Sequence, residues 1–273
     1  MFNLLKKNIP FKEIETHLAK AKKLEGKKVN ECVDSLYDYH NKKNHSGAKF
    51  KSHRKLTKGV FARFIEEDYF GLKINSRAEA DFSDVGLELK VTGIKHTPQN
   101  DLYNAKERLV LSMINYEELC KYEKWTDNIH LFNKLNKILI IIYLYEKKPV
   151  EFENFKIIHT FVWSPNENQK KIIQHDYSVI RRKVLNGQII SERHTSFLAN
   201  CPKHAGGYNK ANPSKSKPQS IDKRHPYLDF AERRAFCIKN RILDQLIADS
   251  LGLELRKIGS SVGLFRKDYP NFK

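Results

Sequence analysis

The run Ile138–Tyr145 constrains the fold of this chain more than any other segment. It consists only of aliphatic residues and tyrosines, and a second run of β-branched and aromatic residues, Phe155–Trp163, follows after a turn that contains Lys-Lys-Pro. Short apolar runs bounded by turn residues predict β-strands. A helix that crosses a membrane needs about 20 apolar residues, so these runs predict a central sheet and no membrane partner.

The segments on either side of the two strands predict helices, which makes the expected fold class α+β. Thr57 is a suitable N-cap for a helix over Leu56–Phe70, and Gly71 is expected to end it. Segments Lys106–Cys120 and Ile189–Cys201 leave the element type open: a strand or a helix for the first, a strand or a turn for the second. The remaining elements are expected to be helices over Phe11–Lys23, Asp176–Leu185 and about Asn240–Leu251, and a short strand over Arg234–Lys239.

The charge balance favours a polyanionic partner. The chain has 50 Lys and Arg residues against 32 Asp and Glu residues, a net charge of +18. Folding does not require such an excess, whereas nucleic acid binding uses it. The alternative is that an AT-rich genome encodes lysine-rich proteins. Pro202–Pro226, which is irregular and lysine-rich, predicts either a loop that contacts DNA or a plain surface loop.

The four cysteines are scattered along the sequence, at positions 32, 120, 201 and 237. This usage predicts a reducing, cytoplasmic location and no disulfide framework. A structural zinc site is not expected either, because no C-x₂-C pair is present and Cys201–His204 offers a single half-site.

The pattern Asp81-x₆-Glu88-x-Lys90 carries the chemistry. Apolar and charged residues alternate over Gly86–Val91, so Glu88 and Lys90 share one face of a predicted strand. Carboxylates of this kind suit Mg²⁺, and a neighbouring lysine can orient water or stabilise developing charge during phosphodiester hydrolysis. Asp84 is a rival first carboxylate, although it lies in a predicted turn. The alternative is that these charged residues form an ordinary solvent-exposed face of a strand and have no catalytic role.

The stretch Ala80–Thr92 closely resembles the catalytic segment of the MutH family, which includes a mismatch-repair nicking endonuclease and type II restriction endonucleases that cut at GATC. The resemblance extends over about residues 55–252. It includes Glu67–Gly71 upstream, and Lys106–Leu111, Ile190–Leu198 and Arg234–Lys239 downstream. It implies a restriction-endonuclease fold of the PD-(D/E)xK class, with a mixed sheet flanked by helices and two lobes around a DNA-binding cleft.

The resemblance also implies roles for particular residues. Asp81 and Glu88 would bind Mg²⁺, Lys90 would act on the attacking water, and Glu67 would support the metal site as a further catalytic residue. Cys201-Pro202-Lys203 stands where the repair enzyme has Arg-Pro-Lys, so Lys203 remains a candidate reader of guanine. Cys237 occupies the position that senses adenine methylation, where a small side chain predicts weak discrimination. The further candidate DNA contacts are Lys106, Arg108, Arg193, Lys210 and Lys239.

These observations predict three parts: an N-terminal extension over 1–50, partly helical and without an assigned role; a MutH-like domain over 51–252; and a C-terminal tail over 253–273. Within the domain, a catalytic lobe would cover about 51–165 and a DNA-reading lobe about 166–252. The expected function is that of a Mg²⁺-dependent restriction endonuclease acting on double-stranded DNA, as a homodimer on DNA and beside a cognate methyltransferase. The alternatives are a repair nickase activated by a partner and a DNA-binding module without catalysis.

Overall fold

The computed structural model of the chain describes residues 11–34, 57–72, 78–147, 150–190, 194–203, 221–222, 225–228 and 231–265. The fold is of the mixed α+β type, with a six-stranded sheet as its largest element. Strands β1 and β4 are parallel, and the other neighbours in the sheet are antiparallel. In sheet order, the strands are β10 (Arg256–Ile258), β11 (Ser261–Phe265), β2 (Leu102–Ala105), β1 (Glu88–Thr97), β4 (Ile138–Tyr145) and β5 (Ile157–Trp163).

Strand β4 is the centre of the hydrophobic core. Its side chains alternate between two apolar clusters on opposite faces of the sheet: Ile138, Ile140 and Ile142 on one face, and Leu139, Ile141 and Tyr143 on the other. A strand that is buried on both faces has no need of polar residues, which explains the continuous apolar run. The strands predicted at β4 and β5 are confirmed.

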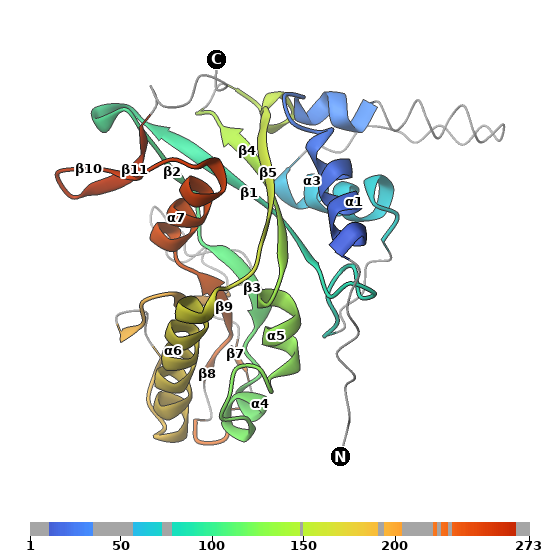
Figure 1. Ribbon diagram of the computed structural model, residues 1–273. Coiled ribbons are helices and arrows are strands. Elements are labelled where there is room, and N and C mark those ends of the chain that lie inside the picture. The colour runs from blue at the N-terminus through green and yellow to red at the C-terminus, as the bar shows by residue number, and fades with distance from the viewer. Residues whose placement is uncertain are drawn as a thin grey trace, which may run out of the picture.

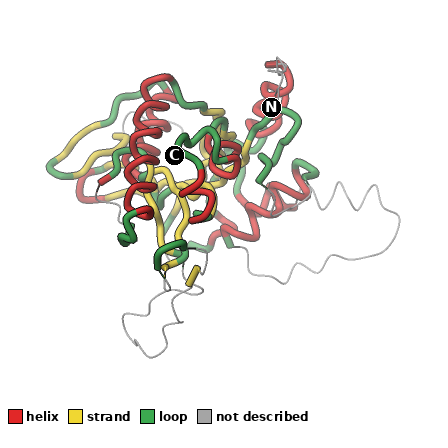
Figure 2. Tube along the Cα trace, turned by 90° about the horizontal axis from the view of Figure 1, so that it is seen from below, coloured by secondary structure: helices red, strands yellow, loops and turns green. Residues whose placement is uncertain are grey.

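Helices cover both faces of the sheet (Figures 1 and 2). Figure 1 shows α1 and α3 on one side of the long strands and α7 on the other. A second sheet of three strands, in the order β3-β9-β6, lies below the first in this view, with α4, α5 and α6 around it. The bounds are α1 Phe11–Lys22, α3 Lys58–Phe64, α4 Tyr116–Lys121, α5 Ile129–Leu135, α6 Glu167–Leu185, α7 Asn240–Leu251, β3 Leu109–Met113, β6 Leu198–Pro202 and β9 Arg234–Ile238.

Shorter elements complete the chain. A π-helical turn, Ile65–Tyr69, continues α3 directly, and the backbone turns at Gly71 with φ +75°. The predicted N-cap is confirmed, because the Thr57 hydroxyl accepts a hydrogen bond from the Val60 N–H. The other short elements are the 3₁₀ turns Pro98–Asn100 and Phe152–Asn154 and the strands β7 Ile221–Asp222 and β8 Ala231–Glu232.

The expected three-part division differs from the structure in three places. Residues 256–265, which were expected to belong to a C-terminal tail, are part of the fold, because β10 and β11 extend the main sheet beyond β2. Helix α1 belongs to the same apolar cluster as β1 and β4, so the described part of the N-terminal extension, residues 11–34, packs into the core. A boundary near residue 165 does not separate the two sheets, because β3 pairs with β9. In the described part of the chain, no helix is long and apolar enough to cross a membrane.

Candidate active site

Asp81 and Glu88 are held together at the start of β1. The segment between them folds back on itself, with a bridge between Phe82 and Leu87 and a left-handed residue at Gly86 (φ +60°). The Leu89 N–H donates to Oδ2 of Asp81 at 2.9 Å, and the Asp81 N–H donates to Oε2 of Glu88 at 3.3 Å. Each carboxylate therefore accepts a hydrogen bond from the other's segment, which fixes their separation.

Strand alternation brings Lys90 to the same face as Glu88, as the sequence predicts. Leu89 and Val91 point the other way, into the apolar cluster beneath α1 and α3. The Lys90 ammonium donates to Oε1 of Glu88. Glu88 is only 1% exposed, so its charge depends on partners of this kind.

Lys134, in the last turn of α5, completes the cluster and was not predicted. Its ammonium donates to Oε2 of Glu88 at 2.7 Å and to Oδ1 of Asp81 at 3.4 Å. Helix α5 is positioned by the Asn128 N-cap, and the Asn133 side chain donates to the Ala78 carbonyl just before Asp81. No local pattern marks Lys134, because its contacts lie 46 and 53 residues away in the sequence.

The electrostatics of the cluster reflect its burial. Burial raises the pKa of Glu88, and the nearby Lys90 ammonium opposes that effect. Burial alone would lower the pKa of Lys134, but the charges of Glu88 and Asp81 outweigh it and raise the pKa. Glu66 also has a raised pKa, first because it is half-buried and then because Asp81 repels its charge. Carboxylates that share a site in this way suit a positive ligand.

The charge of Glu66 acts on this cluster, whereas Glu67, the residue expected to support it, is paired with Arg63. Glu67 is held on the outer side of the helix by Arg63, whose guanidinium donates to both of its carboxylate oxygens at 2.8 and 3.2 Å. The charge of Glu66, in contrast, interacts with those of Asp81, Glu88, Lys90 and Lys134. Adjacent residues of a helix point in different directions, so only one of the two can face the site.

Two carboxylates with oxygens turned toward one point fit a hard divalent cation such as Mg²⁺. Such ions prefer oxygen ligands and keep several waters, so they do not need a complete set of protein ligands. Among the described residues, no group of three or more His, Cys, Asp or Glu side chains forms a metal cluster. The donors on this chain would therefore be Asp81 and Glu88.

Several predicted DNA contacts surround an open hollow beside the second sheet. The hollow has a volume of about 760 Å³, and Arg108, Cys201, Lys239 and Arg241 contribute to its lining. Lys203 follows β6 at the rim of this sheet, where its N–H donates to the Arg233 carbonyl. Burial lowers the pKa of Lys203, and the charge of Glu107, which also lines the hollow, opposes this.

The other predicted contacts are placed differently. The Lys106 ammonium lies over the ring of Tyr145, 4.4 Å from its centroid. The Lys239 ammonium donates to the Thr195 carbonyl, which gives it a structural partner at the start of α7. Arg193 and Lys210 lie outside the described residues. The structure therefore brings Arg108, Lys203 and Lys239 to the second sheet and places Lys106 elsewhere.

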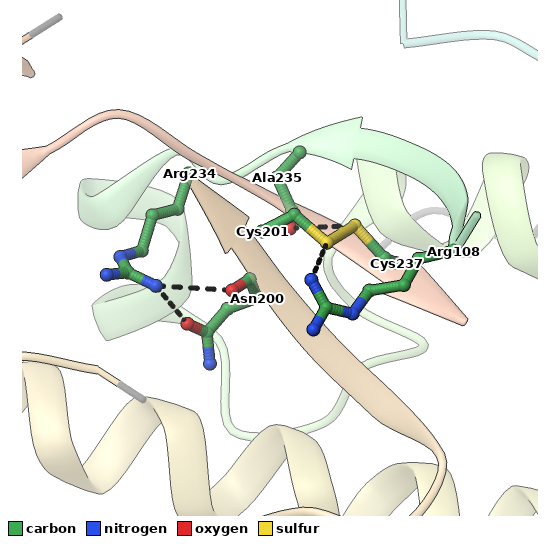
Figure 3. Close-up of a disulfide and its surroundings, with 6 residues drawn as sticks. All are labelled: Arg108, Asn200, Cys201, Arg234, Ala235 and Cys237. Carbon is green, nitrogen blue, oxygen red and sulfur yellow. Dashed lines mark hydrogen bonds between the residues drawn. A yellow bond between two sulfur atoms is a disulfide. The ribbon is translucent and has the colours of Figure 1, made fainter. Parts of the chain in front are cut away.

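A disulfide joins Cys201 of β6 to Cys237 of β9, contrary to the expectation of unpaired cysteines (Figure 3). The residues are 36 positions apart in the sequence, but their strands are neighbours and their Cα atoms lie 6.5 Å apart. Cys237 is fully buried, while the Cys201 sulfur contacts the Arg108 guanidinium. Arg234 donates to the carbonyl and side chain of Asn200 in the same view.

The candidate active site lies in a part of the chain that matches known proteins. Residues 70–176 match the family model described as "DNA mismatch repair enzyme MutH". This part of the chain is similar to the MutH family. This range includes Asp81, Glu88, Lys90 and Lys134, so the whole carboxylate and lysine cluster falls within the matched part.

Two kinds of family member resemble the chain. The type II restriction enzyme Sau3AI of Staphylococcus aureus is 31% identical over 186 residues, which is 66% of this chain and 35% of that enzyme. The DNA mismatch repair protein MutH of Vibrio parahaemolyticus is 26% identical over 179 residues, 64% of this chain and 75% of that protein. The chain thus spans about a third of the restriction enzyme and most of the repair protein.

Proposed function

We propose that this protein is a Mg²⁺-dependent endonuclease that hydrolyses phosphodiester bonds in double-stranded DNA. The observation that carries the proposal is the convergence of Asp81 and Glu88 oxygens on one point beside Lys90. DNA binding alone requires no buried carboxylate pair facing a phosphate. The net charge of +18 and the match of residues 70–176 to the MutH family model support the same function.

In this proposal each residue has a defined task. Asp81 and Glu88 would hold the metal ion, which supplies charge neutralisation and an activated water. Lys90, fixed against Glu88, would orient the attacking water or donate to the charge that develops on the phosphate. Glu66 takes the supporting role expected of Glu67, because its carboxylate is the one that interacts with the cluster.

GATC is the proposed recognition sequence, and it rests on the family resemblance. The hollow lined by Arg108 and Cys201, together with Lys203 at the end of β6, is the proposed DNA-reading surface. Lysine and arginine can donate to the acceptors of guanine in the major groove. The resemblance places Cys237 at the position that senses adenine methylation, and its side chain is small, so we expect methylated and unmethylated adenine to be cut at similar rates.

The experiment is digestion of a supercoiled plasmid that carries methylated or unmethylated GATC sites, with Mg²⁺ or EDTA. Discrete fragments that end at GATC, absent in EDTA and with Lys90→Ala, are the expected result. Lys95→Ala is a matched control, because Lys95 lies on the same strand but makes no contact with Glu88 or Asp81 among the described interactions. Salt-sensitive binding without cleavage on any plasmid would contradict the proposal.

A repair-type nicking endonuclease is the second candidate, and one observation favours it. The chain matches 75% of the Vibrio MutH protein but only 35% of the restriction enzyme. Nicked circles that require a second protein, such as a mismatch-repair factor, would identify this function. Linear fragments from the purified chain alone would identify the restriction function.

A further inference from the structure

Lys134 occupies the point toward which the two candidate metal ligands turn. Oδ2 of Asp81 accepts a hydrogen bond from the Leu89 N–H, and Oε1 of Glu88 accepts one from the Lys90 ammonium. The opposite oxygens, Oδ1 of Asp81 and Oε2 of Glu88, both accept from the Lys134 ammonium. A cation that used both carboxylates through these oxygens would therefore have to take the place of this ammonium.

We propose that Lys134 is an internal counter-ion that holds the metal site in its metal-free state and must be displaced when a divalent cation binds. The inference rests on the proposed metal-dependent function and adds a competition step to it. The buried Glu88 carboxylate, with the Asp81 charge beside it, is costly without a partner, so an ammonium from α5 stabilises the two carboxylates in the absence of metal. An ammonium and a divalent cation cannot both occupy the position between the two carboxylates, because they repel each other at contact distance.

The geometry allows the displacement. The Lys134 side chain is 17% exposed and that of Asp81 is 24% exposed, whereas Glu88 is 1% exposed, so the cluster reaches solvent on the side of Lys134 and Asp81. Its long stem can move the ammonium outward without a change in the backbone of α5. The anchors of α5, the Asn128 cap and the Asn133 contact with Ala78, do not involve the ammonium.

The competition predicts how metal affinity responds to mutation. Lys134→Met keeps most of the side-chain volume and removes the competing charge, so we expect Mn²⁺ to bind roughly fivefold tighter or more, a coupling of ordinary size between linked sites. Lys137→Met is the matched control. It makes the same charge change three residues away, where the ammonium contacts only the Val85 carbonyl, at 3.5 Å, among the described interactions. We expect no comparable gain from it.

Titration calorimetry of the full chain with Mn²⁺ measures this affinity without reference to cleavage. Tighter binding by Lys134→Met but not by Lys137→Met supports the proposal, and equal or weaker binding by Lys134→Met overturns it. If Lys134→Met does not fold, the wild type provides the test. Amine acetylation of Lys134, read by mass spectrometry, should rise when Mn²⁺ is added to EDTA-treated protein, and unchanged labelling overturns the proposal.

These outcomes are separate from the test of the proposed function. Plasmid cleavage by the wild type together with unchanged Mn²⁺ affinity in Lys134→Met rejects the competition and leaves the nuclease intact. Absence of both Mn²⁺ binding and cleavage in the wild type rejects the proposed function itself.

Discussion

Glu66 and Glu67 are chemically identical neighbours with opposite surroundings, so they make a matched pair of substitutions. Glu66→Gln removes a carboxylate whose charge acts on the catalytic cluster, and we expect a loss of cleavage of roughly 10–100-fold, as for other groups that support a metal site. Glu67→Gln removes only the contact with Arg63 on the outer face and should stay near wild type.

Cleavage rates of the two variants at saturating Mg²⁺, with thermal unfolding as a control for folding, check this prediction. A larger loss from Glu67→Gln than from Glu66→Gln would restore the assignment made from the sequence. The assignment of Glu67 came from the family resemblance, and the π turn over Ile65–Tyr69 changes the direction in which neighbouring side chains point in this part of the helix.

Residues linked by local rules were predictable, and residues linked by tertiary contacts were not. Strand alternation is enough to place Glu88 and Lys90 on one face, and an N-cap preference is enough to find Thr57. Lys134 reaches Glu88 from another helix across 46 residues, so no spacing in the sequence reveals it. The disulfide was missed for the same reason, because strand pairing brings Cys201 close to Cys237.

Within the elements, the pairing of β1 with β4 depends on a missing side chain at Gly93. Gly93 lies opposite Tyr143 in the register, and a methyl group there would lie 2.5 Å from Cε2 of the buried Tyr143 ring. Since the core has no room for this, Gly93→Ala should lower the free energy of unfolding by about 1–3 kcal/mol, the usual cost of overpacking.

Chemical denaturation of Gly93→Ala measures this cost. Gly59→Ala in α3 is the control, because a methyl group at that position meets no atom within 4 Å. Alanine also has the higher helix propensity, so the control should be neutral or stabilising. Equal stability of the two variants would show that Tyr143 can move aside.

Helix α7 is joined to β2 by a buried carboxyl group, which makes this contact sensitive to pH. Asp244 accepts a hydrogen bond from the Ala105 N–H at 2.5 Å, and burial raises the pKa of Asp244 to about 7. The folded state therefore holds a proton that the unfolded state releases near its ordinary pKa of 3.8. The contribution of Asp244 to stability is full below that pKa and is lost as pH rises to about 7.

Asp244→Asn retains an acceptor for the Ala105 N–H and cannot ionise. We expect its stability to fall less than that of the wild type when pH rises from about 4 to about 7, a window set by the shifted pKa. Denaturant melts across this range measure the difference, with Asp249→Asn on the exposed side of α7 as the control. Parallel pH profiles for the wild type and Asp244→Asn would contradict the assignment.

Element boundaries show the same limit of local reasoning. The helix over Asn240–Leu251 and the strand within Arg234–Lys239 follow from periodicity, and both are confirmed. Strands β10 and β11 are short, and they join the sheet because β11 pairs with β2 and β10 pairs with β11. For β3, the sequence leaves strand and helix open, because pairing with the distant β9 decides its conformation.

At the scale of the whole molecule, interacting charged residues lie between the proposed DNA-reading surface and the helix that leads to the candidate active site. Glu107 forms an ion pair with Lys58 at the start of α3, and its charge also acts on Lys203 after β6. Helix α3 continues into the turn that carries Glu66.

Under the proposed function, the single Asp81–Glu88 cluster of a chain would cut one strand at a time, and double-strand cleavage would call for two copies. A symmetric dimer on a palindromic site is the simplest arrangement. We therefore expect linear plasmid to form with a dependence on enzyme concentration that is steeper than first order. An excess of the Asp81→Asn chain, which would pair with active copies, should divert the product to nicked circles. Strictly first-order nicking without linear product, even at high enzyme concentration, would show that each chain acts alone and would favour the nicking function.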